Sequence, residues 1–229
     1  MSIENNNFGG NAPGGPPAGS GGGASQPHKD SGSGTFSSEF RHNPVSARVP
    51  DRVAKGVLST GILVLDGPNE FVIDFMQALT RPFHVAARVV LSPAVMEQFG
   101  NALRENVARF EQRFGPPPTL PKPPSDRRPT LQEIYDEFKL PDDMLNGSYA
   151  NAVMVGHSAS EFFFDFITNF YPTSCVSNRI FMSAAQIPRT LEALSMAIDR
   201  FKQKVIAARQ AQQQPPPPPP PNPDSPPHQ

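Results

Sequence analysis

The sequence predicts an α+β fold built from two tandem β-β-β-α units, each an antiparallel meander followed by a long amphipathic helix. Three observations predict it. The chain repeats itself with an offset of 91 residues, so that EFVIDF at 70–75 returns as EFFFDF at 161–166. Strand-like alternation in each repeat gives way to helical spacing of apolar residues. Stretches rich in Gly, Ser and Pro flank and separate the repeats. We expect the two units to form a pseudo-dimer within one chain.

The two ends of the chain differ in composition from the middle. Residues 1–45 are mostly Gly, Ser, Asn, Pro and Ala, and residues 209–229 include a long proline run. Neither end has enough large apolar side chains to offset the entropy of ordering, and successive prolines favour polyproline II. We therefore expect two disordered tails, the second being a docking motif or a spacer. The folded units are then 46–114 and 130–208, joined by a Pro-rich linker at 115–129.

Each unit is expected to begin with three strands. The first strand covers 55–65 in one unit and 148–156 in the other, where β-branched and apolar residues dominate. The repeated hexamer is the second strand, and the third covers 85–92 and 176–183. Alternation along the hexamer places one apolar set on a single face. Together with two helix leucines, this set is the predicted core: Phe71, Ile73, Phe75, Leu103, Phe162, Phe164, Phe166 and Leu194.

A long amphipathic helix is expected to close each unit. Ser92 precedes a proline, which combines an N-cap residue with proline at the first helical position. In the second unit Ser183 and Gln186 have the spacing of a capping box. Apolar residues then recur at intervals of four and three, so they form one stripe on the helix. Thr130 is predicted to cap a short leading helix over 131–138.

Two repeated charges are predicted to form structural ion pairs. If the second and third strands form a hairpin, Asp74 lies opposite Arg88, and Asp165 lies opposite Arg179 in the second unit. The alternative is a catalytic or metal-binding carboxylate. The rest of this face is apolar and therefore needs cover from the sister unit, a second subunit or a partner. The possible interface residues are Val72, Met76, Val90, Phe163, Ile167 and Phe181.

Composition and missing motifs narrow the functional classes. The net charge of −1 gives no bulk attraction to nucleic acid or to an acidic membrane surface. Cys175 is the only cysteine, which excludes an intramolecular disulfide and fits a reducing compartment such as the cytoplasm. No stretch of about 18 consecutive apolar residues occurs. Phosphate-binding glycine loops and nucleophile–His–Asp constellations are also missing. We therefore expect no enzyme activity, no cofactor, no metal site and no membrane association.

Motifs in both units resemble a known family. The stretch YANAVMVGHSASEFFFDF followed by NRIFMSAAQIPRTLEAL, and EFVIDF followed by ARVVLSPAVMEQFGNALRENVARFEQRFG, are similar to short bacterial and archaeal proteins of the domain of unknown function 3467 family. The resemblance covers nearly all of both units and implies no catalytic residue, substrate or cofactor. The second unit departs from the family's Ser-Pro junction by carrying Ala184. More loosely, the meander plus helix is similar to the bacterial export chaperone and to Whirly-type domains, an analogy of architecture alone.

These observations favour a non-enzymatic protein-binding or assembly module, either a scaffold or a holdase-like protein. We expect a protein partner or self-association. The alternative is a single-stranded nucleic-acid-binding protein that stacks bases on phenylalanines of one sheet face and neutralises phosphates with nearby arginines. A third possibility is an enzyme that uses Asp74 or Asp165.

Overall fold

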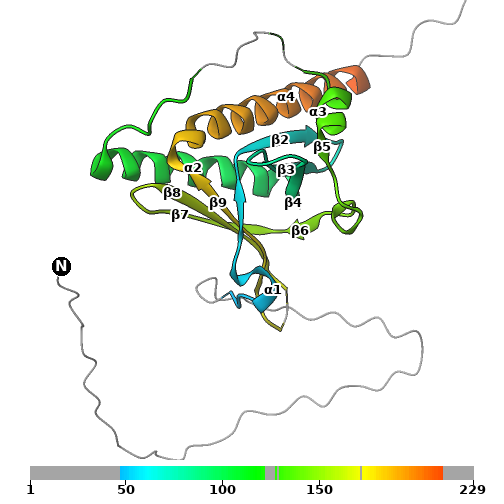
Figure 1. Ribbon diagram of the computed structural model, residues 1–229. Coiled ribbons are helices and arrows are strands. Elements are labelled where there is room, and N and C mark those ends of the chain that lie inside the picture. The colour runs from blue at the N-terminus through cyan, green and yellow to red at the C-terminus, as the bar shows by residue number, and fades with distance from the viewer. Residues whose placement is uncertain (1–46, 122–126, 128, 171, 214–229) are drawn as a thin grey trace, which may run out of the picture. The chain divides into compact units, whose positions relative to one another are not determined.

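The computed structural model describes residues 47–121, 127, 129–170 and 172–213 (Figure 1). The two expected tails, apart from residues 209–213, lie outside these residues, and so does part of the linker. The first unit contains α1 (Asp51–Ala54), β1 (Val57–Ser59), β2 (Gly61–Asp66), β3 (Phe71–Gln77), β4 (Phe83–Leu91) and α2 (Pro93–Phe114). The second contains α3 (Leu131–Glu137), β5 (Phe138–Lys139), η1 (Asp142–Met144), β6 (Ser148–Ala150), β7 (Ala152–His157), β8 (Glu161–Thr168), β9 (Cys175–Ser183), η2 (Ala184–Gln186) and α4 (Ile187–Gln213), where η marks a 3-10 helix. The α+β class and the tandem repeat are confirmed.

The two units exchange strands. The first sheet has the order β2-β3-β4-β5, and β6 of the second unit also pairs with β4. The second sheet has the order β1-β9-β8-β7, and it therefore contains β1 of the first unit. The three exchanged strands, β1, β5 and β6, run parallel to their new neighbours, whereas the meanders β2-β3-β4 and β7-β8-β9 are antiparallel. Each sheet is thus completed by a strand from the sister unit.

The prediction of one continuous first strand over 55–65 and over 148–156 is therefore wrong. Each stretch breaks at one polar residue, Thr60 or Asn151, and continues in the other sheet. The Thr60 hydroxyl accepts a hydrogen bond from the Ala78 amide, and the Asn151 side chain accepts one from the Asn169 amide. These bonds satisfy backbone donors at the point where the strand leaves its first neighbour.

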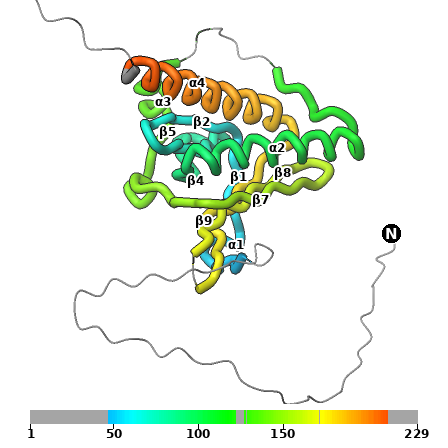
Figure 2. Tube along the Cα trace, turned by 180° about the vertical axis from the view of Figure 1, so that it is seen from behind, coloured from blue at the N-terminus to red at the C-terminus, as the bar shows by residue number. Residues whose placement is uncertain are grey.

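The helices are exchanged as well. We expected each helix to shield its own sheet, but α2 packs chiefly against β7, and α4 packs chiefly against β2. The two helices also contact each other and run side by side in Figure 2. Each unit therefore buries its apolar helix stripe on the sheet of its sister, so neither unit has a complete core of its own.

One core joins both units. The rings of Phe75 and Phe166 come from different sheets and lie 5.5 Å apart, centroid to centroid. Phe99 of α2 makes edge contacts with Phe164 and Phe166 at 5.2 and 5.3 Å. All eight predicted core residues are buried, none more than 1% exposed. The hydrophobic pattern of the sequence thus identified the core, although it did not show which elements share it.

The helix ends are partly as predicted. The Ser92 hydroxyl caps α2 by accepting from the Val95 amide, and Thr130 forms a capping box with Glu133 at the start of α3. The predicted capping box at Ser183 is not formed, because the next residues adopt a 3-10 turn whose first amide, of Ala184, donates to the Ser160 carbonyl. At the other end α4 continues to Gln213, beyond the expected limit of 208, since Ala, Arg and Gln there are good helix formers.

Candidate protein-binding face

Each sheet carries an Asp–Arg pair on its outer face, which is turned away from the shared core. Arg88 donates from Nε to Asp74 Oδ1 at 2.7 Å and from Nη2 to Oδ2 at 2.8 Å. Arg179 makes the same two bonds to Asp165, both at 2.7 Å. Both aspartates are buried, 0% and 1% exposed. Such two-pronged pairs between buried groups fix the register of neighbouring strands.

The hairpins place these pairs in register. Asp74 is the cross-strand neighbour of Arg88, and Asp165 is the neighbour of Arg179. A β-bulge shifts each register by one residue beyond Phe75 and Phe166, closer to the turn than the ion pair. The pairing at the aspartates is therefore the one expected for a regular hairpin, because the irregularity begins only after it.

Helix α3 covers the pair on the first outer face. The Tyr135 hydroxyl donates to Asp74 Oδ2 at 2.5 Å and accepts from Arg88 Nη2 at 3.1 Å. Burial and the bond to Asp74 raise the pKa of Tyr135 to about 12, so the hydroxyl keeps its proton at neutral pH. The hydrogen bond to Asp74 also raises the pKa of Arg88 above its usual value. Tyr135, Asp74 and Arg88 thus form one hydrogen-bonded network.

The sister unit also packs a glycine on each arginine. Gly147 has φ 64° and Gly56 has φ 63°, and the two positions are 91 residues apart. A Cβ at Gly147 would lie 2.9 Å from Arg88 Cγ, and one at Gly56 would lie 3.0 Å from Arg179 Cγ. The positive φ and the close approach both require glycine. The pseudo-symmetry of the two units therefore extends to the backbone that crosses each ion pair.

The symmetry breaks at the cover of the second outer face. We define this face by two rows of residues. One row crosses β1, β9, β8 and β7 and consists of Leu58, Phe181, Phe163 and Gly156. The row beside it contains the ion pair and consists of Arg179, Asp165 and Met154. Met154 is 49% exposed and Leu58 is 39% exposed. Arg179 is 24% exposed, compared with 13% for Arg88. Within the described ranges, no helix lies here as α3 does on the first face, and Asp165 has no hydroxyl partner equivalent to Tyr135.

The second outer face is mostly apolar, and its surface is uneven. The Phe163 ring lies over Gly156, where any side chain would collide with it. A cavity of about 350 Å³ lies at one end of the face, lined by His157, Ser158, Glu161, Phe162, Phe163 and Phe181. The second outer face therefore combines apolar side chains with one buried ion pair.

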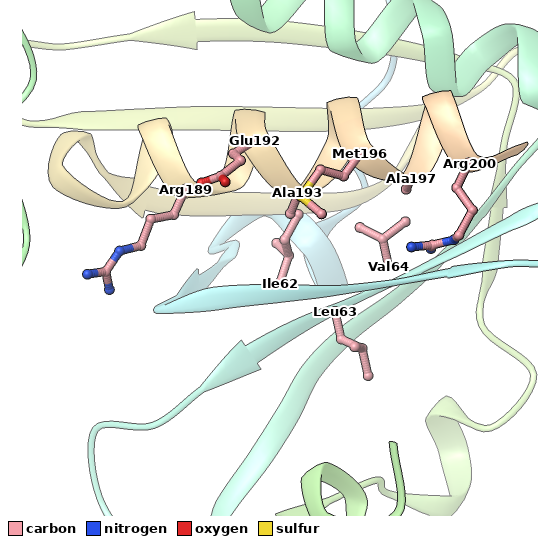
Figure 3. Close-up of a pocket in the computed structure, with 9 residues that line it drawn as sticks. All are labelled: Ile62, Leu63, Val64, Arg189, Glu192, Ala193, Met196, Ala197 and Arg200. Atoms are coloured by element: carbon pink, nitrogen blue, oxygen red, sulfur yellow. The ribbon is translucent and has the colours of Figure 1, made fainter. Parts of the chain in front are cut away.

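A groove runs beside each edge strand, between the strand and the exchanged helix. The groove between β2 and α4 has a volume of about 430 Å³ (Figure 3). Ile62 and Val64 point into it, whereas Leu63 points to the other side of the strand. The equivalent groove between β7 and α2 has a volume of about 340 Å³ and is lined in part by Val153 and Val155. Both grooves follow from the helix exchange.

The last residue of each edge strand meets the exchanged helix differently in the two halves. Asp66 accepts hydrogen bonds from Arg200 and Lys204 of α4. Burial raises the pKa of Asp66, but Arg200 and Lys204 together lower it by more, so the pKa lies below its usual value. The equivalent residue in the second half is His157, which lies near two arginines of α2. Its pKa is lowered by burial and by those arginines, so His157 is neutral at pH 7.

Several groups that chemistry would need are not brought together. Among the described residues, no three of His, Cys, Asp and Glu lie close enough to hold a metal ion. Each of the two repeated aspartates is bound by an arginine and buried, so neither carboxylate is free to act as a base.

No helix in the described part of the chain is long and apolar enough to cross a bilayer.

Four of the predicted interface residues lie in cross-strand pairs on the two outer faces, whereas Ile167 lines the groove between β7 and α2. Val72 pairs with Val90 across the first sheet, and Phe163 pairs with Phe181 across the second. Ile167 is more buried than expected, at 8% exposure. Sequence reasoning missed Tyr135, because its contact with Asp74 joins residues 61 positions apart. It also missed Leu58 and Met154, whose place on the second face depends on the strand exchange.

Comparison with known proteins identifies the repeated unit. The family model described as "Protein of unknown function (DUF3467)" matches the chain twice, at residues 21–118 and 121–206. No curated protein matches the chain. The two matches cover nearly all of the two exchanged units, and together they cover most of the sequence. The chain therefore belongs to the DUF3467 family and carries two tandem copies of its domain.

Proposed function

We propose that this chain is a non-enzymatic protein-binding or assembly module that receives a segment of a partner protein on the second outer face. One observation carries the proposal. The first outer face has the same ion pair and a similar apolar surround, and the chain covers it with its own short helix, α3. The equivalent second face exposes Met154 and Leu58. The first face thus shows that a face of this kind can be covered by a segment of protein, in this case α3 of the same chain.

The chemistry of the face defines what a partner must supply. Phe163, Phe181 and Leu58 offer apolar area, whose burial stabilises by about 25 cal/mol per Å². Aromatic side chains of this kind dominate the energetics of interfaces. Asp165 offers carboxylate oxygens equivalent to those that bind Tyr135 in the first sheet. The partner segment therefore carries apolar side chains and a hydroxyl or amide donor.

A cytoplasmic location belongs to the same proposal. It is supported by the single cysteine, Cys175, because proteins of oxidising compartments commonly use disulfides. A scaffold or holdase-like role is consistent with a binding face that needs no cofactor.

Single-stranded nucleic acid is the second candidate ligand, and one observation favours it. Tyr149 and Phe170 form a stacked pair with centroids 6.1 Å apart and planes 8° apart. They are 47% and 51% exposed, so a base could stack on them. Two facts weigh against this reading: Arg179 is already bound to Asp165, and the net charge of the chain is −1.

The proposal is tested by comparing what associates with three tagged full-length chains in their native cells. These are the wild type, Met154→Asp on the second outer face, and Ile206→Asp, a control on α4 that is 54% exposed, compared with 49% for Met154. We expect Met154→Asp to lose proteins that the other two chains retain, and nuclease treatment to leave the retained set unchanged. Identical sets for all three chains, or loss of the set on nuclease treatment, would refute the proposal.

A further inference from the structure

We propose that the cavity lined by α1, η1, β4 and β9 is a binding site for a small zwitterion, an amino acid with a free ammonium and a free carboxylate group. The cavity has a volume of about 290 Å³, at the lower end of the range for small-molecule sites. This site lies beyond the proposed function and does not depend on it.

The cavity lies where equivalent parts of the two units meet. Arg52 of α1 and Asp143 of η1 both line it, and these residues are 91 positions apart. Val53 and Met144, which also line it, are related in the same way. Residues related by a two-fold lie on opposite sides of its axis, so a dimer of identical units has the same charge on both sides. In this chain one side is cationic and the other is anionic.

The side chain of Asn178 provides the observation that points to a ligand. Asn178 lines the cavity, and its Nδ2 is buried. Among the described residues, this atom is the one buried side-chain nitrogen or oxygen without a hydrogen-bond partner. An unsatisfied buried donor is costly, so native proteins rarely keep one without a use for it. The equivalent residue of the first unit is Ala87, which shows that the fold itself does not require a polar side chain here.

Arg179 adds a second unused donor to the same cavity. Its Nε and Nη2 bind Asp165, whereas its Nη1 makes no hydrogen bond to a described residue. In the other unit the equivalent atom, Arg88 Nη1, donates to the Leu145 carbonyl at 3.4 Å. The two arginines are therefore equivalent in their ion pairs but not in their third nitrogen.

The groups around the cavity define the ligand. The donors of Asn178, Arg179 and Arg52 require acceptor oxygens, which a carboxylate supplies together with its charge. Asp143 requires a cation, which an ammonium supplies. Neither Arg52 nor Asp143 makes an ion pair with another described residue, and both are exposed, so a ligand can reach them. A ligand with one charge would leave the opposite group unpaired, whereas a zwitterion satisfies both. The remaining walls include Val57 and Met144, so they favour an apolar ligand body.

The test is calorimetric titration of the purified full-length chain with valine, leucine and γ-aminobutyrate, which differ in size and in the separation of their two charges. Isocaproate and isoamylamine are the matched probes, since each has the carbon skeleton of leucine but only one of its charges. At least one amino acid should bind at one site per chain, about tenfold or more tightly than either matched probe. The inference is overturned if none of the amino acids binds saturably, or if isocaproate binds as tightly as they do.

Charge variants locate the binding. Arg52→Ala and Asp143→Asn should each weaken it about tenfold or more, because each removes one partner of a charged group. Lys55→Ala and Asp142→Asn are the controls, since these neighbouring residues are also exposed but do not line the cavity. Unchanged binding in Asp143→Asn, or equal weakening in the controls, would overturn the inference.

Asn178→Ala tests the buried donor, and the variant should fold because alanine occupies the equivalent place in the first unit. The side-chain amide signal of Asn178 in a nitrogen-proton NMR spectrum is identified by its loss in this variant. That signal should shift when the wild type is saturated with the amino acid, and the variant should bind more weakly. A signal that does not move at saturation would overturn the inference. Met154→Asp should leave this binding unchanged, so the site and the proposed function are tested independently.

Discussion

Replacing Tyr135 with phenylalanine removes one hydroxyl and leaves the ring that packs beneath α3. That hydroxyl donates to Asp74 Oδ2 at 2.5 Å, and the Asp74 carboxylate is fully buried. A hydrogen bond to a charged group contributes about 1.5–3 kcal/mol. Arg88 still binds both carboxylate oxygens in the variant, so the loss should lie near the lower end. We expect Tyr135→Phe to lower the free energy of unfolding by about 2 kcal/mol.

The assay is urea unfolding of the full chain, read as a shift of the midpoint at constant slope. A double-mutant cycle with Asp74→Asn isolates the contact, because the variant without the charge should be much less sensitive to Tyr135→Phe. Alkaline pH gives a second test. The pKa of Tyr135 is raised to about 12, so the wild type should lose stability as pH rises from the unfolded value near 10 toward 12. An unshifted midpoint, or an equal shift in both backgrounds, would refute the reasoning about α3.

Three further predictions follow from the same geometry. Gly147→Ala should lower the free energy of unfolding by more than about 1 kcal/mol, because its φ is 64° and its Cβ would lie 2.9 Å from Arg88 Cγ; Gly61→Ala, with open space around it, is the control in the same urea assay. His157 has a lowered pKa from burial and two arginines, so acidification below about pH 6.5 should destabilise the wild type more than His157→Gln, measured as urea midpoints at pH 7.5 and pH 5. Phe99→Ala should cost about 3–5 kcal/mol and keep a single unfolding transition, because Phe99 contacts phenylalanines of the sister unit; two separate calorimetric transitions would show that the units fold independently.

The sequence predicts well those features that depend on local pattern. Alternation along the repeated hexamer identifies Phe75 and Phe166 as core, and hairpin counting brings Asp74 to Arg88. The capping box at Thr130 correctly places the start of α3. Each of these rests on neighbours within one element or one hairpin, where spacing alone determines which side chains meet.

The exchange between units could not be predicted in the same way. The strand-like sequence pattern continues through Thr60 and Asn151, so nothing in this pattern marks the point where the chain passes from one sheet to the other. Helical spacing shows which face of α2 is apolar, but it does not show whether that face lies on β4 or on β7. The contact of Tyr135 with Asp74 has the same origin, since it joins residues that only the tertiary fold brings together.

Duplication explains why the protein has two similar outer faces, of which α3 covers the first. Two equal units give two equal outer faces, and the exchange of strands and helices holds the units together without using either face. The start of the second unit, directly after the linker, supplies α3 for the first face. Differences such as Asp66 in one half and His157 in the other show that each half has since diverged.

The most direct measurement is photo-crosslinking in living cells with the probe at Met154, on the edge strand β7 of the second outer face. Ile206, on the outer side of α4, is the matched control position. The proposed function predicts adducts at Met154 that are destroyed by protease, resist nuclease and are missing from the control. Adducts that nuclease destroys, or the same adducts at both positions, would contradict it.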